Sequence, residues 1–258
     1  MTAIERVGTA SATGVTQIRS QPWAAAMIVG GLLCLTGQRL AGFVLLGGVL
    51  AWALREGAAH DARRRARGRA VALVALAATI SISLPEFLGP AGDGLLTICL
   101  VAAPVGWLWL RSPEVRRVLV LHRLSALERV LLAWSALAAV VIGLFVAPLG
   151  PWLGARSAVA VVGLSALLLP FLDEAVYRGL LMDAVGTTVP AVVLVAVVQG
   201  VVVGAGYGWL PMLLTVALAL GLGHVRRVTG RWQAALMTHL GISLGLVIPY
   251  FLAAGAAR

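Results

Sequence analysis

Nine long apolar segments fill most of this chain and constrain its fold more than any other feature. Crossing a bilayer core of about 30 Å takes about 20 apolar residues in a helix. Only 12% of the residues are charged and 60% are apolar, whereas about a quarter of a soluble domain is charged. The sequence therefore predicts an all-α, polytopic integral membrane helical bundle of about eight to nine transmembrane helices. The predicted segments are 23–37, 40–54, 70–88, 94–110, 129–148, 157–182, 190–206, 210–226 and 233–253.

The first two segments are short for a membrane span, which leaves two interpretations. They form either a hairpin of two helices or one long segment interrupted by Gly37-Gln38-Arg39. The distribution of arginine favours the hairpin. With a cytoplasmic N-terminus, 17 of the 20 arginines fall on the inside, and only Arg39, Arg156 and Arg258 fall outside. This is the bias of multi-pass membrane proteins, whose inner loops carry the positive charge.

The net charge of +10 would by itself suggest a nucleic-acid partner. The arginines cluster between the spans, however, so we expect membrane lipids as partners and no nucleic acid. The predicted location is the cell membrane, as a multi-pass protein of a bacterial plasma membrane with the N-terminus in the cytoplasm. Cys34 and Cys99 both lie within spans, where we expect small buried apolar residues rather than a disulfide or a metal site.

Two Arg-rich stretches, 55–69 and 111–129, divide the chain. We expect a cytoplasmic tail over 1–22, an N-terminal transmembrane region over 23–124 and a C-terminal core over 125–258. The buried polar chemistry is concentrated in that core.

The sequence Asp173-Glu174-Ala-Val-Tyr-Arg178 places two acids and a cation inside an apolar segment. Ionisable residues within a span are costly and mark functional sites. On a helix Glu174 and Arg178 share a face and can pair, while Asp173 is rotated by about 100° and shares its face with Tyr177. Asp173 is thereby left to serve as a general base. The alternative is that the whole cluster is a buried polar contact between helices without chemistry.

This segment resembles the first motif of the CPBP family, the CAAX-processing and bacteriocin-processing intramembrane endopeptidases. That family carries Glu-Glu-x-x-x-Arg, Phe-x-x-x-His and His-x-x-x-Asn on three spans. Gly179 follows the first motif here as is typical of the family, and His239-Leu-Gly-Ile-Ser243 resembles the third motif. The resemblance covers about residues 125–255.

The resemblance implies hydrolysis of a peptide bond in a membrane-associated peptide or protein substrate near the cytoplasmic leaflet. It assigns Asp173 as the base that activates water, or Glu174 if the helix is rotated relative to the family. Glu174 and Arg178 become the supporting pair, His239 the second catalytic group or oxyanion partner, and Ser243 takes the place of the family's Asn. No cofactor is implied.

The middle motif departs from the family, because its Phe and His positions fall near Gly200 and Gly204. These two glycines predict a seam where two membrane helices approach closely. Gln199 is then a surrogate donor for the missing His, or makes a hydrogen bond between helices.

Three further interpretations stay open at this point. The first is a catalytically inactive family member that acts as a membrane scaffold or partner-binding protein. The second is a transporter that uses the acids as a proton site. The third is a catalytic zinc ion held by Asp173 or Glu174 together with His224 and His239, since catalytic zinc takes three protein ligands.

Overall fold

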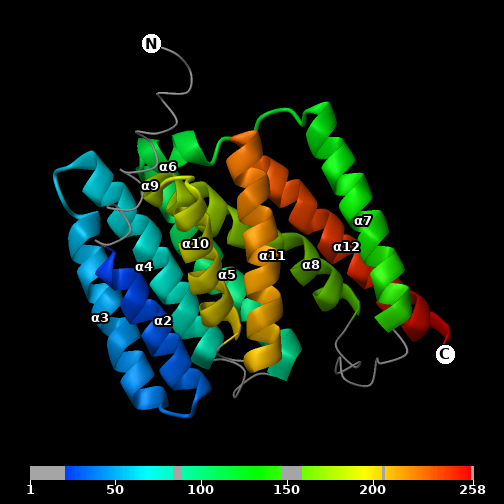
Figure 1. Cartoon of the computed structure of the whole chain (residues 1–258), viewed down its shortest axis with the longest axis horizontal. Helices are drawn as coiled ribbons and strands as arrows, with labels where there is room; N and C mark the ends of the chain where they lie inside the picture. The colour runs from blue at the N-terminus through cyan, green and yellow to red at the C-terminus, as the bar shows by residue number, and fades with distance from the viewer. Residues whose placement is uncertain (1–20, 84–88, 147–158, 205–206, 257–258) are drawn as a thin grey trace.

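The computed structural model describes residues 21–83, 89–146, 159–204 and 207–256 (Figure 1). Every regular element in these ranges is a helix. In chain order they are α2 (Pro22–Leu35), α3 (Arg39–Gly57), α4 (Ala62–Ser83), α5 (Gly89–Arg111), α6 (Pro113–Val118), α7 (Ala126–Val146), α8 (Val159–Asp173), the π-helix η3 (Glu174–Leu181), α9 (Met182–Val185), α10 (Val189–Gly204), α11 (Trp209–Thr229) and α12 (Trp232–Ala256).

The all-α membrane bundle is confirmed, and helical residues lie within each of the nine predicted segments as far as the structure describes them, with 157–182 divided among α8, η3 and the start of α9. Among the described residues, five helices are long and apolar enough to cross a membrane: α3, α4, α7, α11 and α12. Shorter apolar helices cover Pro22–Leu35, Ile98–Arg111 and Val189–Val202. The short helix α6, which begins after Ser112 with Pro113 in its first turn, was not predicted, because six residues carry no usable hydrophobic period.

The first two predicted segments form a hairpin rather than one interrupted helix. The chain reverses at Gly37, whose φ of 89° lies in the left-handed region that glycine tolerates. The backbone N–H of Gln38 donates to the Leu33 carbonyl at 2.8 Å and closes the turn. The helices α2 and α3 then approach closely, since a Cβ on Gly30 would lie 3.2 Å from the Gly42 carbonyl oxygen.

Successive spans alternate in direction, so the Arg-rich connections gather at one end of the bundle. Figure 1 shows α6, α9 and the junction between α11 and α12 together at the upper end. At the same end the turn between α3 and α4 is fixed by buried Glu56, which accepts a hydrogen bond from Arg64 Nε at 3.0 Å. We call this end of the bundle the Arg-rich end.

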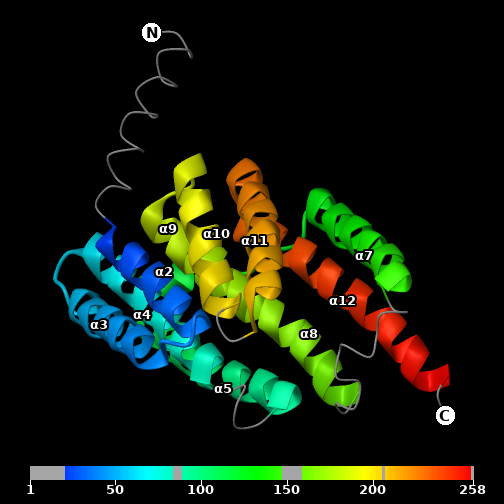
Figure 2. The ribbon, with the colours of Figure 1, turned by 60° about the horizontal axis from the view of Figure 1, so that its bottom comes forward.

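The π-helix η3 lies in the middle of the bundle and packs against α4, α8, α10 and α12. Figures 1 and 2 show α2 and α3 on one side of it, and α7 with α12 on the other. Glycines bring α7 and α12 together, because Cβ atoms on Gly241 and Gly245 would each lie 3.0 Å from a backbone nitrogen of α7. Close backbone contact at small residues is how membrane helices associate.

Cys34 is buried as expected, but Cys99 is exposed on α5, so the expectation of burial was wrong for that residue. A cysteine in a membrane span can face either lipid or other helices. Hydropathy does not distinguish these two positions. The predicted N-terminal tail lies outside the described residues, apart from its last two positions.

Candidate functional site

The predicted pair of Glu174 and Arg178 is present and is joined by His239. Arg178 Nε lies 3.4 Å from Glu174 Oε2, and neither side chain has any exposed surface. Nδ1 of His239, on α12, lies 2.9 Å from Glu174 Oε1. An ionised carboxylate can only accept hydrogen bonds, so Nδ1 carries the proton and Nε2 is left free of this contact. One buried acid thereby holds a cation from its own helix and an imidazole from another helix.

Two further helices hold Arg178. Its Nη1 donates to the side-chain oxygen of Gln199 on α10, and its Nη2 donates to the Ala219 carbonyl on α11 at 2.8 Å. The two terminal nitrogens of this buried guanidinium are satisfied by an amide oxygen and a backbone carbonyl, while Nε has only the ion-pair contact with Glu174 and no hydrogen bond among the described residues. The structure therefore gives Gln199 the role of a hydrogen bond between helices, the second of its two predicted interpretations.

The backbone that presents these side chains is a π-helix. All eight residues from Glu174 to Leu181 are buried, and the N–H of Met182 donates to the Tyr177 carbonyl five residues earlier. Pro170 precedes this segment within α8 and cannot donate the usual helical hydrogen bond. π-helical segments are rare and frequently occur at functional sites. The carbonyl of Arg178 also accepts from Arg226 Nε at 3.3 Å, which ties η3 to α11.

Asp173 has a different environment from its neighbour. It is partly exposed at the end of α8, and its carboxylate has no hydrogen-bond partner among the residues that the structure describes. It lines a cavity of about 30 Å³ together with Ser81 of α4 and Tyr177 of η3. A water molecule occupies about 30 Å³ in the liquid, and the side chains of Ser81, Asp173 and Tyr177 offer it polar partners in a lining that is otherwise apolar. The geometry thus separates the two acids, as the helical spacing predicted.

Ser243 lies one turn beyond His239 on α12 and is partly buried. Its side chain makes no hydrogen bond within the described part of the chain. The structure therefore brings Glu174, Arg178, His239 and Gln199 into one network, and leaves Asp173 and Ser243 beside it.

The predicted glycine seam is present at Gly200. A Cβ there would lie 2.9 Å from the Val216 nitrogen and 3.1 Å from the Met212 carbonyl oxygen of α11. Gly204 ends α10, and its contacts lie outside the described residues. The predicted seam is therefore a close packing contact between α10 and α11.

His224 is exposed near the end of α11. No group of three or more His, Cys, Asp or Glu side chains comes close enough to hold a metal ion within the described ranges. Of the residues named for a zinc site, Glu174 and His239 are in contact, and His224 does not complete a group of three with them in the described structure.

A second anchor for α12 was not recognised from the sequence. Glu128, which is 1% exposed at the start of α7, accepts from the Ser125 backbone N–H at 2.7 Å, and its own N–H donates to Ser125 Oγ at 3.2 Å. Its other carboxylate oxygen lies 3.3 Å from Arg231 Nε, directly before α12. The Ser-x-x-Glu spacing is the signature of such a capping box and could have revealed it. The contact fixes the start of the helix that carries His239.

Residues 155–245 match the family described as type II CAAX prenyl endopeptidase Rce1-like. The matched range contains the first and third motifs in full. No curated protein and no solved structure matches the chain.

Proposed function

We propose, from the premise that residues 155–245 belong to the Rce1-like family of type II CAAX prenyl endopeptidases, that this membrane protein is an intramembrane endopeptidase. It hydrolyses a peptide bond of a membrane-associated peptide or protein near the cytoplasmic leaflet. The family and the apolar helices support the class of protein, and the arrangement of Asp173, Glu174 and His239 supports the reaction.

The observation that carries the proposal is the contact between buried Glu174 and partly buried His239, at 2.9 Å. Glu174 fixes the ring orientation and the tautomer of His239 through Nδ1. The Arg178 guanidinium balances the charge of Glu174 and holds it in place from the same helix. A histidine oriented by a carboxylate is a recurring arrangement for proton transfer and for stabilising an oxyanion.

Asp173 supplies the base in this proposal. Its carboxylate has no protein hydrogen bond in the described structure and borders a cavity sized for one water molecule. Asp173 removes a proton from that water as the water oxygen bonds to the scissile carbonyl carbon. The carbonyl oxygen becomes an oxyanion, which accepts a hydrogen bond from the Ser243 hydroxyl and from Nε2–H of His239 when the ring carries a proton on both nitrogens. The C–N bond then breaks, and the proton passes to the leaving amine. The reaction uses side chains and water alone.

The orientation belongs to the same proposal. We infer a cell membrane, bacterial by composition, with the N-terminus and the Arg-rich end in the cytoplasm, because inner loops carry the positive charge. The side chains of the site then lie within the bundle, closer to the cytoplasmic than to the outer end, since η3 leads directly into the connection at the Arg-rich end.

The test is a comparison of membrane peptide termini by mass spectrometry. Cells carry the wild-type chain, Asp173→Asn, Asp61→Asn or a deletion. Asp61 is an exposed acid in the turn before α4 that caps the backbone N–H of Arg64, so its variant controls for loss of an acid. If the protein is a protease, new termini should appear in cells with the wild type and with Asp61→Asn. They should be absent from cells with Asp173→Asn and from the deletion strain.

A non-catalytic scaffold is the second candidate, and one observation favours it. Gly200 packs so closely on α11 that the family's larger side chain has no room there, and Gln199 is already engaged by Arg178. A scaffold predicts identical termini in cells with the wild type and with Asp173→Asn, while deletion alone changes growth or the composition of membrane complexes.

A further inference from the structure

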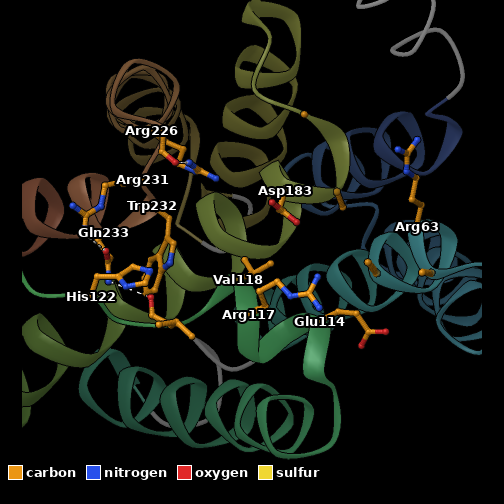
Figure 3. A pocket seen from close by; sticks show the side chains of 16 residues that line it. Arg63, Glu114, Arg117, Val118, His122, Asp183, Arg226, Arg231, Trp232 and Gln233 are labelled. Atoms are coloured by element: carbon orange, nitrogen blue, oxygen red, sulfur yellow. Dashed lines mark hydrogen bonds between the residues drawn. The ribbon is translucent and has the colours of Figure 1, made fainter.

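A second cavity, of about 690 Å³, opens at the Arg-rich end of the bundle (Figure 3). Its walls come from the first turn of α4, from α6, from the end of α9 and from the junction of α11 with α12. The volume is within the range of about 300–1,000 Å³ that small-ligand sites occupy. It shares no lining residue with the cavity beside Asp173.

The charges around this cavity are mostly positive. Arg63, Arg117, Arg226 and Arg231 line it from four different segments, and Figure 3 shows them distributed around its rim. Neither Arg63 nor Arg117 has a hydrogen bond or ion pair with any residue that the structure describes. Unpaired guanidinium groups from separate helices that line one cavity can together bind an anion with several oxygen atoms.

The two acids at the cavity do not neutralise these arginines. Glu114 is already engaged, since Arg65 Nη2 lies 2.8 Å from one of its oxygens and Ser112 Oγ donates to the other at 2.6 Å. Asp183 is exposed in the same cavity and makes no hydrogen bond or ion pair with described residues. Asp183 acts electrostatically on Arg226, so one carboxylate without a direct partner stands against four arginines and the cavity keeps a positive surplus.

The position of the cavity favours a lipid as the source of the anion. The apolar spans α4, α11 and α12 begin or end at its walls, so it lies where the hydrocarbon core gives way to headgroups. Val118, Val120 and Trp232 supply apolar surface to the lining. Basic pockets between transmembrane helices at this level bind anionic headgroups.

We propose that this cavity binds the phosphate of an anionic phospholipid headgroup, with Arg63 and Arg117 as its principal ligands. Arg226 and Arg231 are held by protein partners and provide the surrounding positive field. Asp183 opposes the bound anion and limits its affinity.

The test uses the full chain purified in a neutral detergent and titrated with phosphatidylglycerol or phosphatidylcholine, with bound lipid counted by native mass spectrometry. The wild type is expected to retain one phosphatidylglycerol in preference to phosphatidylcholine. Because each surface arginine contributes about 1 kcal/mol to binding an anionic lipid, Arg63→Gln with Arg117→Gln should lower that preference about tenfold or more.

The matched control is Arg55→Gln with Arg129→Gln. Both residues are exposed at the same end of the bundle and lie outside the cavity, so their loss should leave the preference unchanged. An equal fall in both double variants would show general attraction to the Arg-rich end and would overturn the site.

A gain of binding provides a readout that misfolding cannot imitate. Asp183→Asn removes the opposing charge and should raise the affinity for phosphatidylglycerol about two- to fivefold. A fall or no change would contradict the proposal. Inorganic phosphate distinguishes a lipid headgroup from a free phosphate as the bound anion. Phosphate is expected to compete only weakly with phosphatidylglycerol. Tight binding of phosphate, without a preference for phosphatidylglycerol over phosphatidylcholine, would exclude a lipid. Binding of an acidic peptide in place of phosphatidylglycerol would likewise overturn it.

Discussion

Glu174 and His239 are 65 positions apart in the sequence, yet His239 Nδ1 lies 2.9 Å from the Glu174 carboxylate inside the membrane bundle. The contact joins the first and third motifs of the matched family segment. It is completed by Arg178, which pairs with Glu174 and reaches Gln199 on α10 and the Ala219 carbonyl on α11. Four helical segments are thus connected through one fully buried ion pair.

Removal of one partner from this ion pair should be costly. Glu174→Ala leaves Arg178 as a buried charge without its carboxylate, and the free energy of unfolding should fall by about 3–5 kcal/mol. The measurement is the thermal unfolding midpoint of the full chain in detergent. Glu174→Gln with Arg178→Met removes both charges and should recover much of the loss. A midpoint for Glu174→Ala equal to that of the wild type would show that the pair is not buried in the folded protein.

The seam between α10 and α11 can be tested by adding a single methyl group. Gly200→Ala would bring a Cβ within 2.9 Å of the Val216 backbone nitrogen, and backbone atoms cannot move aside cheaply. We expect a loss of about 1–3 kcal/mol, which is the usual cost of overpacking. The matched control is Gly47→Ala on α3, where nothing lies within 4 Å of the new Cβ. That change should leave the unfolding midpoint unchanged or raise it, and equal losses in both variants would contradict the seam.

Stability at acidic pH should depend on Glu114 at the Arg-rich end. The hydrogen bond from Ser112 and the guanidinium of Arg65 lower the pKa of Glu114 to about 2. The pKa of an unfolded glutamate is about 4.3, so ionised Glu114 stabilises the fold above that value. This contribution is lost as the pH falls from about 4.3 towards 2. The unfolding midpoint, followed from pH 6 to pH 3, should fall less steeply in Glu114→Gln than in the wild type. Parallel curves would show that Glu114 makes no such contribution.

Glu128 should act on the site through α12. Glu128→Gln keeps the cap on α7 but removes the charge that faces Arg231, 3.3 Å away. We expect any cleavage activity to decrease while the α7 end stays folded, because His239 lies two turns beyond Arg231. The readout is hydrogen exchange at the start of α12, which should become faster. Ser125→Ala is the control, since it removes the side-chain cap of α7, at a cost of about 1 kcal/mol in stability, and leaves Arg231 unchanged. Equal exchange at α12 in both variants would contradict the role of the ion pair.

Much of the bundle could be predicted from the sequence because a membrane leaves few alternatives. A long apolar segment in lipid has to form a helix that satisfies its own backbone, so the positions of the spans followed from hydropathy. The pair of Glu174 and Arg178 could be predicted from their spacing of four residues. The close contact at Gly200 could be predicted because a glycine in a membrane helix lets another helix approach.

The remaining features depend on which helices become neighbours. The π-helix carries no sequence signal beyond Pro170, and the contact of Glu174 with His239 requires α12 to pack on η3. The exposure of Cys99 and the anchoring of Arg226 on the Arg178 carbonyl likewise depend on tertiary packing. Sequence spacing alone contains none of these relationships.

The cleavage rate of a reconstituted enzyme shows whether Asp173 activates water for attack on the substrate carbonyl. Full-length chain in liposomes is given a peptide that spans a terminus found in the membrane comparison. Since a general base contributes about 10²–10⁴-fold, Asp173→Asn should lower the rate by about 100-fold or more, with Asp61→Asn equal to the wild type. A rate for folded Asp173→Asn within about threefold of the wild type would contradict the account.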